Sequence, residues 1–71
     1  MVQLNKAEFV YRPGMILKEL VDEYNTDHEK QLAFDGFVVL VNGIAHIDPQ
    51  VREKILRDND KIVFLPLLDG G

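Results

Sequence analysis

The sequence contains no cysteine and no tryptophan among its 71 residues. The absence of cysteine excludes disulfide bonds, thiolate nucleophiles and cysteine-based metal sites together. No apolar run approaches the roughly 20 residues that a membrane-spanning helix requires, and no basic segment followed by an apolar one resembles a secretory leader. We therefore expect one small cytoplasmic domain, spanning residues 1–71, with no membrane segment.

Basic residues are also scarce, with eight Lys and Arg against twelve Asp and Glu, and they are scattered along the chain. A formal net charge of −4 argues against a nucleic-acid surface and favours a basic protein partner. The hydrophobic content of 46% is typical of a globular domain, although 71 residues is close to the size at which one core is only marginally sufficient.

One helix is indicated over residues 16–24, because four apolar residues recur at the spacing i, i+3, i+4 and i+7. No Ser, Thr or Asp precedes this helix, so Met15 or Gly14 would have to serve at its start. The polar segment Asn25 to Gly36 that follows is expected to be a loop, and His28 within it an exposed residue. The apolar stripe of the helix consists of Leu17, Leu20, Val21 and Tyr24.

Two hairpins are predicted. Asn42-Gly43 separates two strand-like runs, 37–41 and 44–47, and this pair favours a type I′ turn because both central residues need a positive φ. A second hairpin is expected to turn at Asn5-Lys6, between strands at 2–5 and 8–11.

The last third of the sequence predicts a short helical turn and a final strand. Asp48-Pro49 is a favourable start for a turn reaching Leu56, and the final strand covers 61–66. Asp58 and Asp60 precede this strand, where turn chemistry explains them better than a metal site does. The order β-β-α-β-β-β indicates an α+β fold of two layers.

Apolar residues occupy both odd and even positions in 37–41 and in 62–65, so both faces of these strands are apolar. A single short helix can cover only one face of the sheet, which leaves apolar surface for a partner. The alternative is that the loop Asn25 to Gly36 folds over the second face.

The final eight residues run from an apolar strand through Pro66 to Gly70 and Gly71. Glycine has no Cβ, so a Gly-Gly end can enter a narrow channel that larger side chains would block. Two terminal glycines can also arise by chance or at a frayed end.

With these features, the sequence resembles the ubiquitin-like β-grasp sulfur carriers of thiamin and molybdopterin biosynthesis. The resemblance rests on the element order, the Val41-Asn42-Gly43 turn, the segment Asp58-x-Asp60-x-Ile62-x-Phe64 and the ending Pro66-x-x-x-Gly70-Gly71. It implies a β-grasp fold: a mixed sheet of four to five strands with one main helix on one face and a flexible tail at 67–71.

The resemblance also implies a chemistry for the tail. An E1-like adenylyltransferase would use ATP and Mg²⁺ to convert the Gly71 carboxylate into an acyl-adenylate. A sulfur donor such as a cysteine desulfurase would then replace AMP, leaving a thiocarboxylate that delivers sulfur to thiazole synthase or to the molybdopterin synthase large subunit. The carrier itself would hold no permanent cofactor or metal and would not be an enzyme. Partner contacts are expected from Leu65, Pro66, Leu67, Leu68 and Asp69, the last of these facing a basic residue.

Several departures and alternatives remain. The short N-terminal hairpin and the length resemble the thiamin carrier, whereas Phe64-Leu65-Pro66 resembles the molybdopterin synthase small subunit. A ubiquitin-like modifier joined to lysine through Gly71 is one alternative function, and a non-catalytic β-grasp binding module is another. A stand-alone enzyme is disfavoured, because no Ser-His-Asp set, metal cluster or phosphate-binding loop is present.

Overall fold

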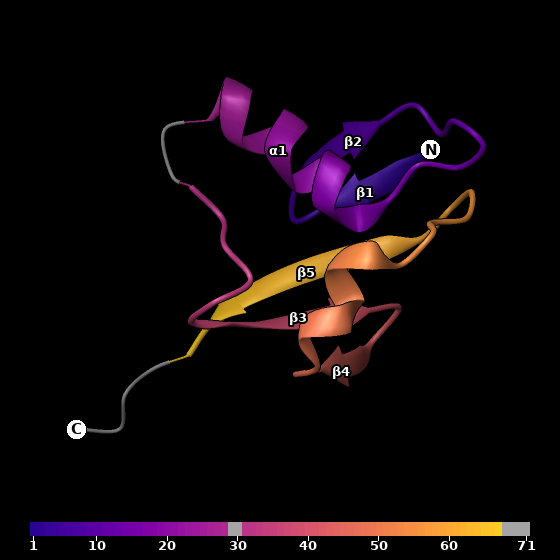
Figure 1. Cartoon of the computed structure of the whole chain (residues 1–71). Helices are drawn as coiled ribbons and strands as arrows, with labels where there is room; N and C mark the ends of the chain where they lie inside the picture. Colours follow the sequence, from indigo (N-terminus) through magenta and orange to yellow (C-terminus); the bar gives the residue numbers. More distant parts are fainter. Residues whose placement is uncertain (29–30, 68–71) are drawn as a thin grey trace.

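The computed structural model describes residues 1–28 and 31–67, which form a five-stranded sheet under one main helix (Figure 1). The strand order is β2-β1-β5-β3-β4, with β1 parallel to β5 and the other pairs antiparallel. The expected α+β class with a mixed sheet is confirmed. The strands are β1 (Val2–Leu4), β2 (Ala7–Phe9), β3 (Phe37–Val41), β4 (Ile44–His46) and β5 (Lys61–Pro66).

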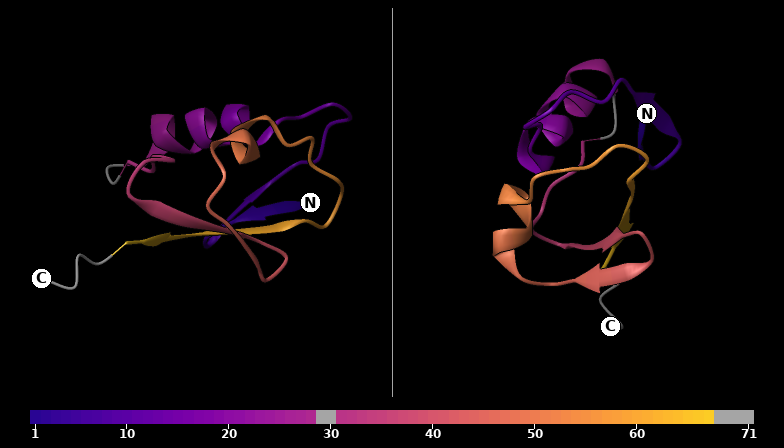
Figure 2. Two further views of the ribbon diagram at one scale, coloured as in Figure 1. Left: turned by 60° about the horizontal axis from the view of Figure 1, so that its bottom comes forward. Right: turned by 90° about the vertical axis from the view of Figure 1, so that its right-hand side faces the viewer.

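The helix α1 (Leu17–Asp27) and the short 3₁₀ helix η1 (Pro49–Glu53) lie on the same face of the sheet (Figure 2). Period-two alternation along the strands turns one set of side chains toward these helices. The predicted helix stripe is inside, with Leu20 only 1% exposed, while Tyr24 packs at the margin of the core. The fully buried members of this core include Val2, Leu4, Leu17, Leu20, Val39, Leu56 and Ile62.

The start of α1 differs from the sequence expectation. Its N-cap is Ile16, which makes no side-chain capping bond, so neither Met15 nor Gly14 fills that role. The Leu17 amide, which has no partner within the helix, donates instead to the Lys54 carbonyl at 3.0 Å. The helix also continues to Asp27 rather than ending at Tyr24.

Both predicted hairpin turns are present. Asn42 and Gly43 have φ of 52° and 84°, as a type I′ turn requires, and Asn5 turns the first hairpin with φ of 53°. Asp48 starts η1 as expected, its carboxylate accepting from the Gln50 amide at 2.9 Å. The helical turn ends at Glu53, short of the predicted Leu56.

Asp60 is the buried acidic residue of the turn before β5, with 7% of its surface exposed. Its carboxylate accepts from the Asn42 side-chain amide at 2.9 Å and from the Arg57 backbone amide at 2.8 Å. The Asn42 side chain also accepts from the Lys61 amide at 2.9 Å. Asp60 is therefore a turn residue, as predicted, and it joins the β3–β4 turn to the start of β5.

The described part of the 25–36 segment packs on the helix side of the sheet. Leu32 belongs to the core, and Asn25 holds it through bonds to its amide at 2.7 Å and its carbonyl at 2.8 Å. Phe34 meets the core residue Phe64 edge to face, with ring centroids 5.5 Å apart. The alternative in which this loop covers the second face of the sheet is therefore wrong.

Candidate functional site at the end of strand β5

The end of β5 carries three of the predicted partner residues on the surface. Leu65 is 46% exposed, Leu67 is 58% exposed, and Pro66 between them is also exposed. β5 ends on the side of the molecule opposite the N-terminus (Figure 1). The predicted site residues Leu68, Asp69, Gly70 and Gly71, which make up the predicted tail apart from Leu67, lie outside the described residues.

The direction in which the chain leaves the sheet is set by one backbone bond. The Leu67 amide donates to the Gly36 carbonyl at 2.9 Å, which extends the β3–β5 ladder by one step beyond Pro66. Gly36 adopts φ of +84°, a conformation that residues with a Cβ rarely adopt. The turn before β3 therefore positions the last residues of β5.

The face of the sheet turned away from the helices carries an apolar strip. Val38 lies directly opposite Leu65, and Leu40 lies opposite Val63 on one side and Ala45 on the other. Val38, Leu40 and Val63 are half-buried by these neighbours, while Ala45 and Leu65 are exposed. We call these five residues the open-face strip. It leads along β5 to Leu67.

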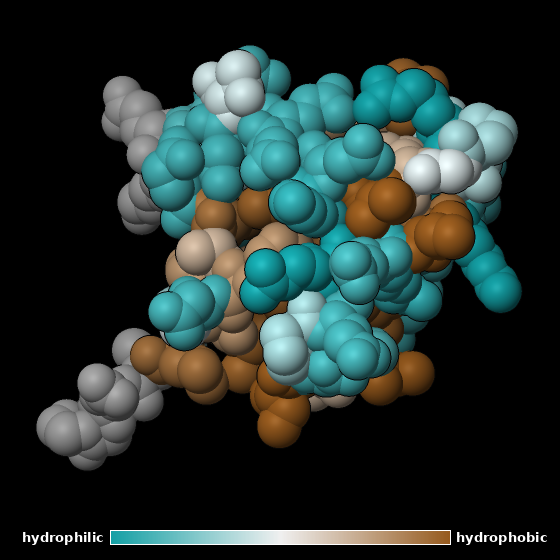
Figure 3. Space-filling model, in the orientation of Figure 1, coloured by the Kyte–Doolittle hydropathy of each residue, from teal (hydrophilic) through white to brown (hydrophobic). Residues whose placement is uncertain are grey.

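The space-filling view shows hydrophobic side chains along the lower edge of the molecule, where β5 ends (Figure 3). Hydrophilic side chains cover most of the helix side in the same view. The exposure of Ala45 and Leu65 on the open-face strip confirms the sequence-based expectation of surplus apolar surface on one face of the sheet. Ile44 and Ile47, 66% and 86% exposed, add apolar area at the β4 edge.

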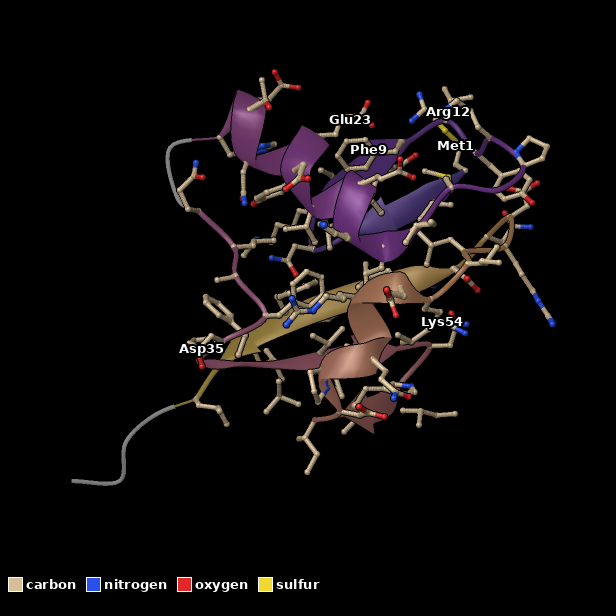
Figure 4. The ribbon with its side chains drawn as sticks, viewed as in Figure 1. Met1, Phe9, Arg12, Glu23, Asp35 and Lys54 are labelled. Carbon is tan, nitrogen blue, oxygen red and sulfur yellow. The ribbon has the colours of Figure 1, made fainter. Side chains whose placement is uncertain are left out.

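Among the described residues, the charged side chain of Asp35 lies beside the end of β5 (Figure 4). The ion pair between Arg12 and Glu23, at 3.2 Å, lies well away from Asp35, next to α1 (Figure 4). The Met1 ammonium donates to Asp58 at 2.6 Å, and this bond lowers the pKa of the Asp58 carboxyl.

Within residues 1–28 and 31–67, no group of three or more His, Asp or Glu side chains is placed to hold a metal ion. His28 stacks on the Tyr24 ring with centroids 3.9 Å apart, and His46 is a half-buried strand residue. In the same part of the chain, no helix has the length and apolarity to cross a membrane.

A family model described as the ThiS family matches residues 2–71. The chain belongs to the ThiS family. No curated protein matches the sequence. Members of the ThiS family are small ubiquitin-like sulfur carriers rather than catalysts, and they interact with E1-like enzymes and sulfur-acceptor enzymes. The resemblance seen in the sequence is thereby confirmed at the level of a sulfur carrier of this kind.

For this ThiS-family chain, the structure brings Leu65, Pro66 and Leu67 together with two residues that sequence reasoning did not select. Gly36 anchors Leu67 through its carbonyl, and Asp35 adds a negative charge beside the same strand end. The Asp-Gly pair is a turn signal in the sequence, but its contact with β5 spans about thirty residues and has no local signature.

Proposed function

We propose that this sulfur carrier is loaded at the carboxylate of Gly71. An E1-like adenylyltransferase joins that carboxylate to AMP, using ATP with Mg²⁺ and releasing pyrophosphate. A sulfur donor such as a cysteine desulfurase then supplies a persulfide, whose outer sulfur displaces AMP and forms an acyl disulfide. A thiol reduces this disulfide by bonding to the donor's sulfur, which leaves a thiocarboxylate on Gly71. The loaded protein delivers its sulfur in the cytoplasm to an acceptor enzyme, thiazole synthase or the molybdopterin synthase large subunit.

The observation that carries this proposal is the exposure of Leu65 and Leu67 at the end of β5, immediately before the sequence that leads to Gly70 and Gly71. Apolar side chains that remain exposed in the folded carrier are available to anchor the strand end in a partner. The two glycines add no Cβ that would obstruct a narrow channel. The exposed leucines would hold the strand end against the partner, and the two glycines would let the chain end pass into a narrow channel. Both features suit a carboxylate that must reach a reaction centre inside another protein.

The open-face strip supports a partner interface next to this anchor. The strip includes Leu65 and leads to Leu67, so one partner surface could cover the strip and the strand end together. Asp35 places negative charge at the same end, Asp69 follows Leu67 two positions later in the sequence, and the chain as a whole carries −4. We therefore expect the adenylyltransferase to present basic residues around the channel that receives the tail.

Features of the chain point to both pathways. The strands of the N-terminal hairpin have only three residues each, which favours the thiamin carrier. The sequence Phe64-Leu65-Pro66 favours the molybdopterin carrier. Sulfur transfer to each of the two acceptor enzymes, measured with the same loaded protein, distinguishes the pathways.

The test of loading is the intact mass of the protein after incubation with the E1-like enzyme of the same organism, ATP, Mg²⁺, a thiol reductant and a cysteine desulfurase with its cysteine substrate. A mass gain that corresponds to exchange of one oxygen for sulfur supports the proposal. The matched control is a chain extended by one residue after Gly71, which should gain no sulfur. Conjugates with lysine side chains, without the thiocarboxylate, would instead indicate a protein modifier.

A further inference from the structure

Strand β5 is longer than the strand that flanks it on one side. The β1–β5 register ends at Leu4 opposite Ile62, whereas β5 continues to Pro66. Asn5 makes the last two bonds on this side, both of 2.8 Å. Its amide donates to the Ile62 carbonyl, and its side-chain oxygen accepts from the Phe64 amide. Among the described residues, the last third of β5 therefore has a neighbouring strand, β3, on one side only.

The backbone groups on this free edge follow from strand geometry. Alternate residues of a strand turn their N–H and C=O groups to the same side. Lys61 and Leu67 turn theirs toward β3, as their bonds to Asn42 and Gly36 show. Phe64 and Pro66 therefore turn their carbonyls to the free side, where the described residues provide no strand to pair with them.

On this edge of β5, the backbone carbonyls of Phe64 and Pro66 can accept hydrogen bonds, but neither residue has a backbone amide available to donate one. The Phe64 amide is already bonded to Asn5, and Pro66 has no amide hydrogen. Two carbonyls two residues apart on a strand are spaced by about 6.6 Å, which is also the spacing of alternate amides in a second strand. A second copy of this chain is a poor occupant, because its corresponding edge would present carbonyls to carbonyls.

A groove of about 470 Å³ runs beside the same edge. The groove crosses this edge of the sheet: Tyr24 of α1 and Phe64 line it on the helix side, and Val63 and Leu65 line it toward the open face. Asn5 and the exposed Lys6 complete the lining. Four of the six lining residues are apolar or aromatic, so the groove can accept one apolar side chain of a bound peptide. Such a pairing of backbone bonds with a side-chain pocket is the arrangement by which extended peptides bind to sheet edges.

We propose that an extended segment of the E1-like adenylyltransferase adds to the sheet beside β5. Two of its amides donate to the Phe64 and Pro66 carbonyls, and one apolar side chain enters the groove next to Tyr24. The inference rests on the proposed function for the identity of the partner. The edge adjoins the exposed Leu65–Leu67 stretch, so a strand bound there would fix the direction in which the tail enters the enzyme.

The first test follows the carbonyl carbons by NMR. The ¹³C shifts of Phe64 and Pro66 are measured through the Leu65 and Leu67 amides, while the E1-like enzyme of the same organism is titrated into the labelled carrier. We expect both carbonyls to move in the direction that a new hydrogen bond produces. The carbonyl of Val63, which points toward β3, is the internal control. A complex in which Phe64 and Pro66 do not move in this way overturns the inference.

The second test uses the absence of cysteine from the chain. Lys6→Cys can carry one bulky maleimide at the rim of the groove, and Lys54→Cys, outside the groove, is the matched control. Blocking two hydrogen bonds should weaken binding to the enzyme by roughly tenfold or more, with no change for the control. Unchanged amide spectra of both free labelled proteins show that folding is intact.

ATP–pyrophosphate exchange by the unlabelled pair separates this inference from the proposed function. If exchange proceeds and the label at position 6 leaves binding unchanged, the edge inference is wrong and the function stands. If the proteins bind without exchange, the proposed function fails, and the carbonyl shifts still decide the inference. If they do not bind, both are wrong.

Discussion

Truncating Leu20 to alanine tests the packing on which every other feature of this protein depends. Leu20 is 1% exposed and lies between α1 and the sheet, so the substitution removes buried methyl groups and leaves a cavity. Such changes cost about 2–5 kcal/mol. A 71-residue domain has a total stability of about 4–11 kcal/mol. Leu20→Ala should therefore remove a large part of the free energy of unfolding.

Urea titration followed by circular dichroism measures this loss, with Lys18→Ala on the exposed side of the same helix as control. The control should change the free energy of unfolding by no more than about 0.5 kcal/mol. For a domain of this size, each kcal/mol corresponds to about 4–8 °C in Tm, so the Leu20 variant should melt roughly 8–40 °C lower. A loss under about 1 kcal/mol would refute the assignment of Leu20 to the core.

Three further changes separate stability from function. Leu65→Asp should abolish binding to the adenylyltransferase, as measured by isothermal titration calorimetry. The melting curve should stay nearly unchanged, because the Leu65 side chain is already 46% exposed. Asp60→Ala should lower the free energy of unfolding by about 2–4 kcal/mol in urea titration, because two bonds to a buried carboxylate are lost. Deleting Gly71, or adding one residue after it, should abolish ATP–pyrophosphate exchange with folding intact, because one residue moves the carboxylate by about 3.5 Å.

Each of these changes has a control and a contradicting outcome. Ile47→Asp, at a side chain 86% exposed and outside the open-face strip, should bind normally; unfolding of the Leu65 variant would place that side chain in the core. Asp60→Asn keeps an acceptor oxygen and should lose less stability than Asp60→Ala, so equal losses would argue against the two bonds. Full exchange by the shortened chain would contradict a role for Gly71.

Local sequence patterns predicted the elements of this protein closely. Asn42-Gly43 determined a type I′ turn, because both residues tolerate positive φ at little cost. The final strand was expected at 61–66 and is observed there. The apolar stripe of the helix identified the side that is buried. Patterns of this kind depend on backbone preferences and on side-chain period, both of which act over a few residues.

The helix start was less predictable from the sequence. No capping side chain is present, and the sequence offered only Met15 or Gly14 as candidates. The Leu17 amide donates instead to the carbonyl of Lys54, which lies more than thirty residues away in the sequence. A backbone carbonyl is present at every position, so no residue type in the sequence marks which one will serve.

The candidate site likewise has some features that the sequence predicted and others that only the tertiary structure determined. Sequence alone determined the apolar run through Leu65 and Leu67 and the two glycines after it, since these are properties of adjacent residues. Only the tertiary structure decided that the 25–36 segment packs beside the helix and leaves the open-face strip uncovered. It also decided that β1 stops at Leu4 and that Gly36 holds Leu67. These outcomes depend on which backbone groups form hydrogen bonds across the sheet, and the packing of the whole chain determines those pairings.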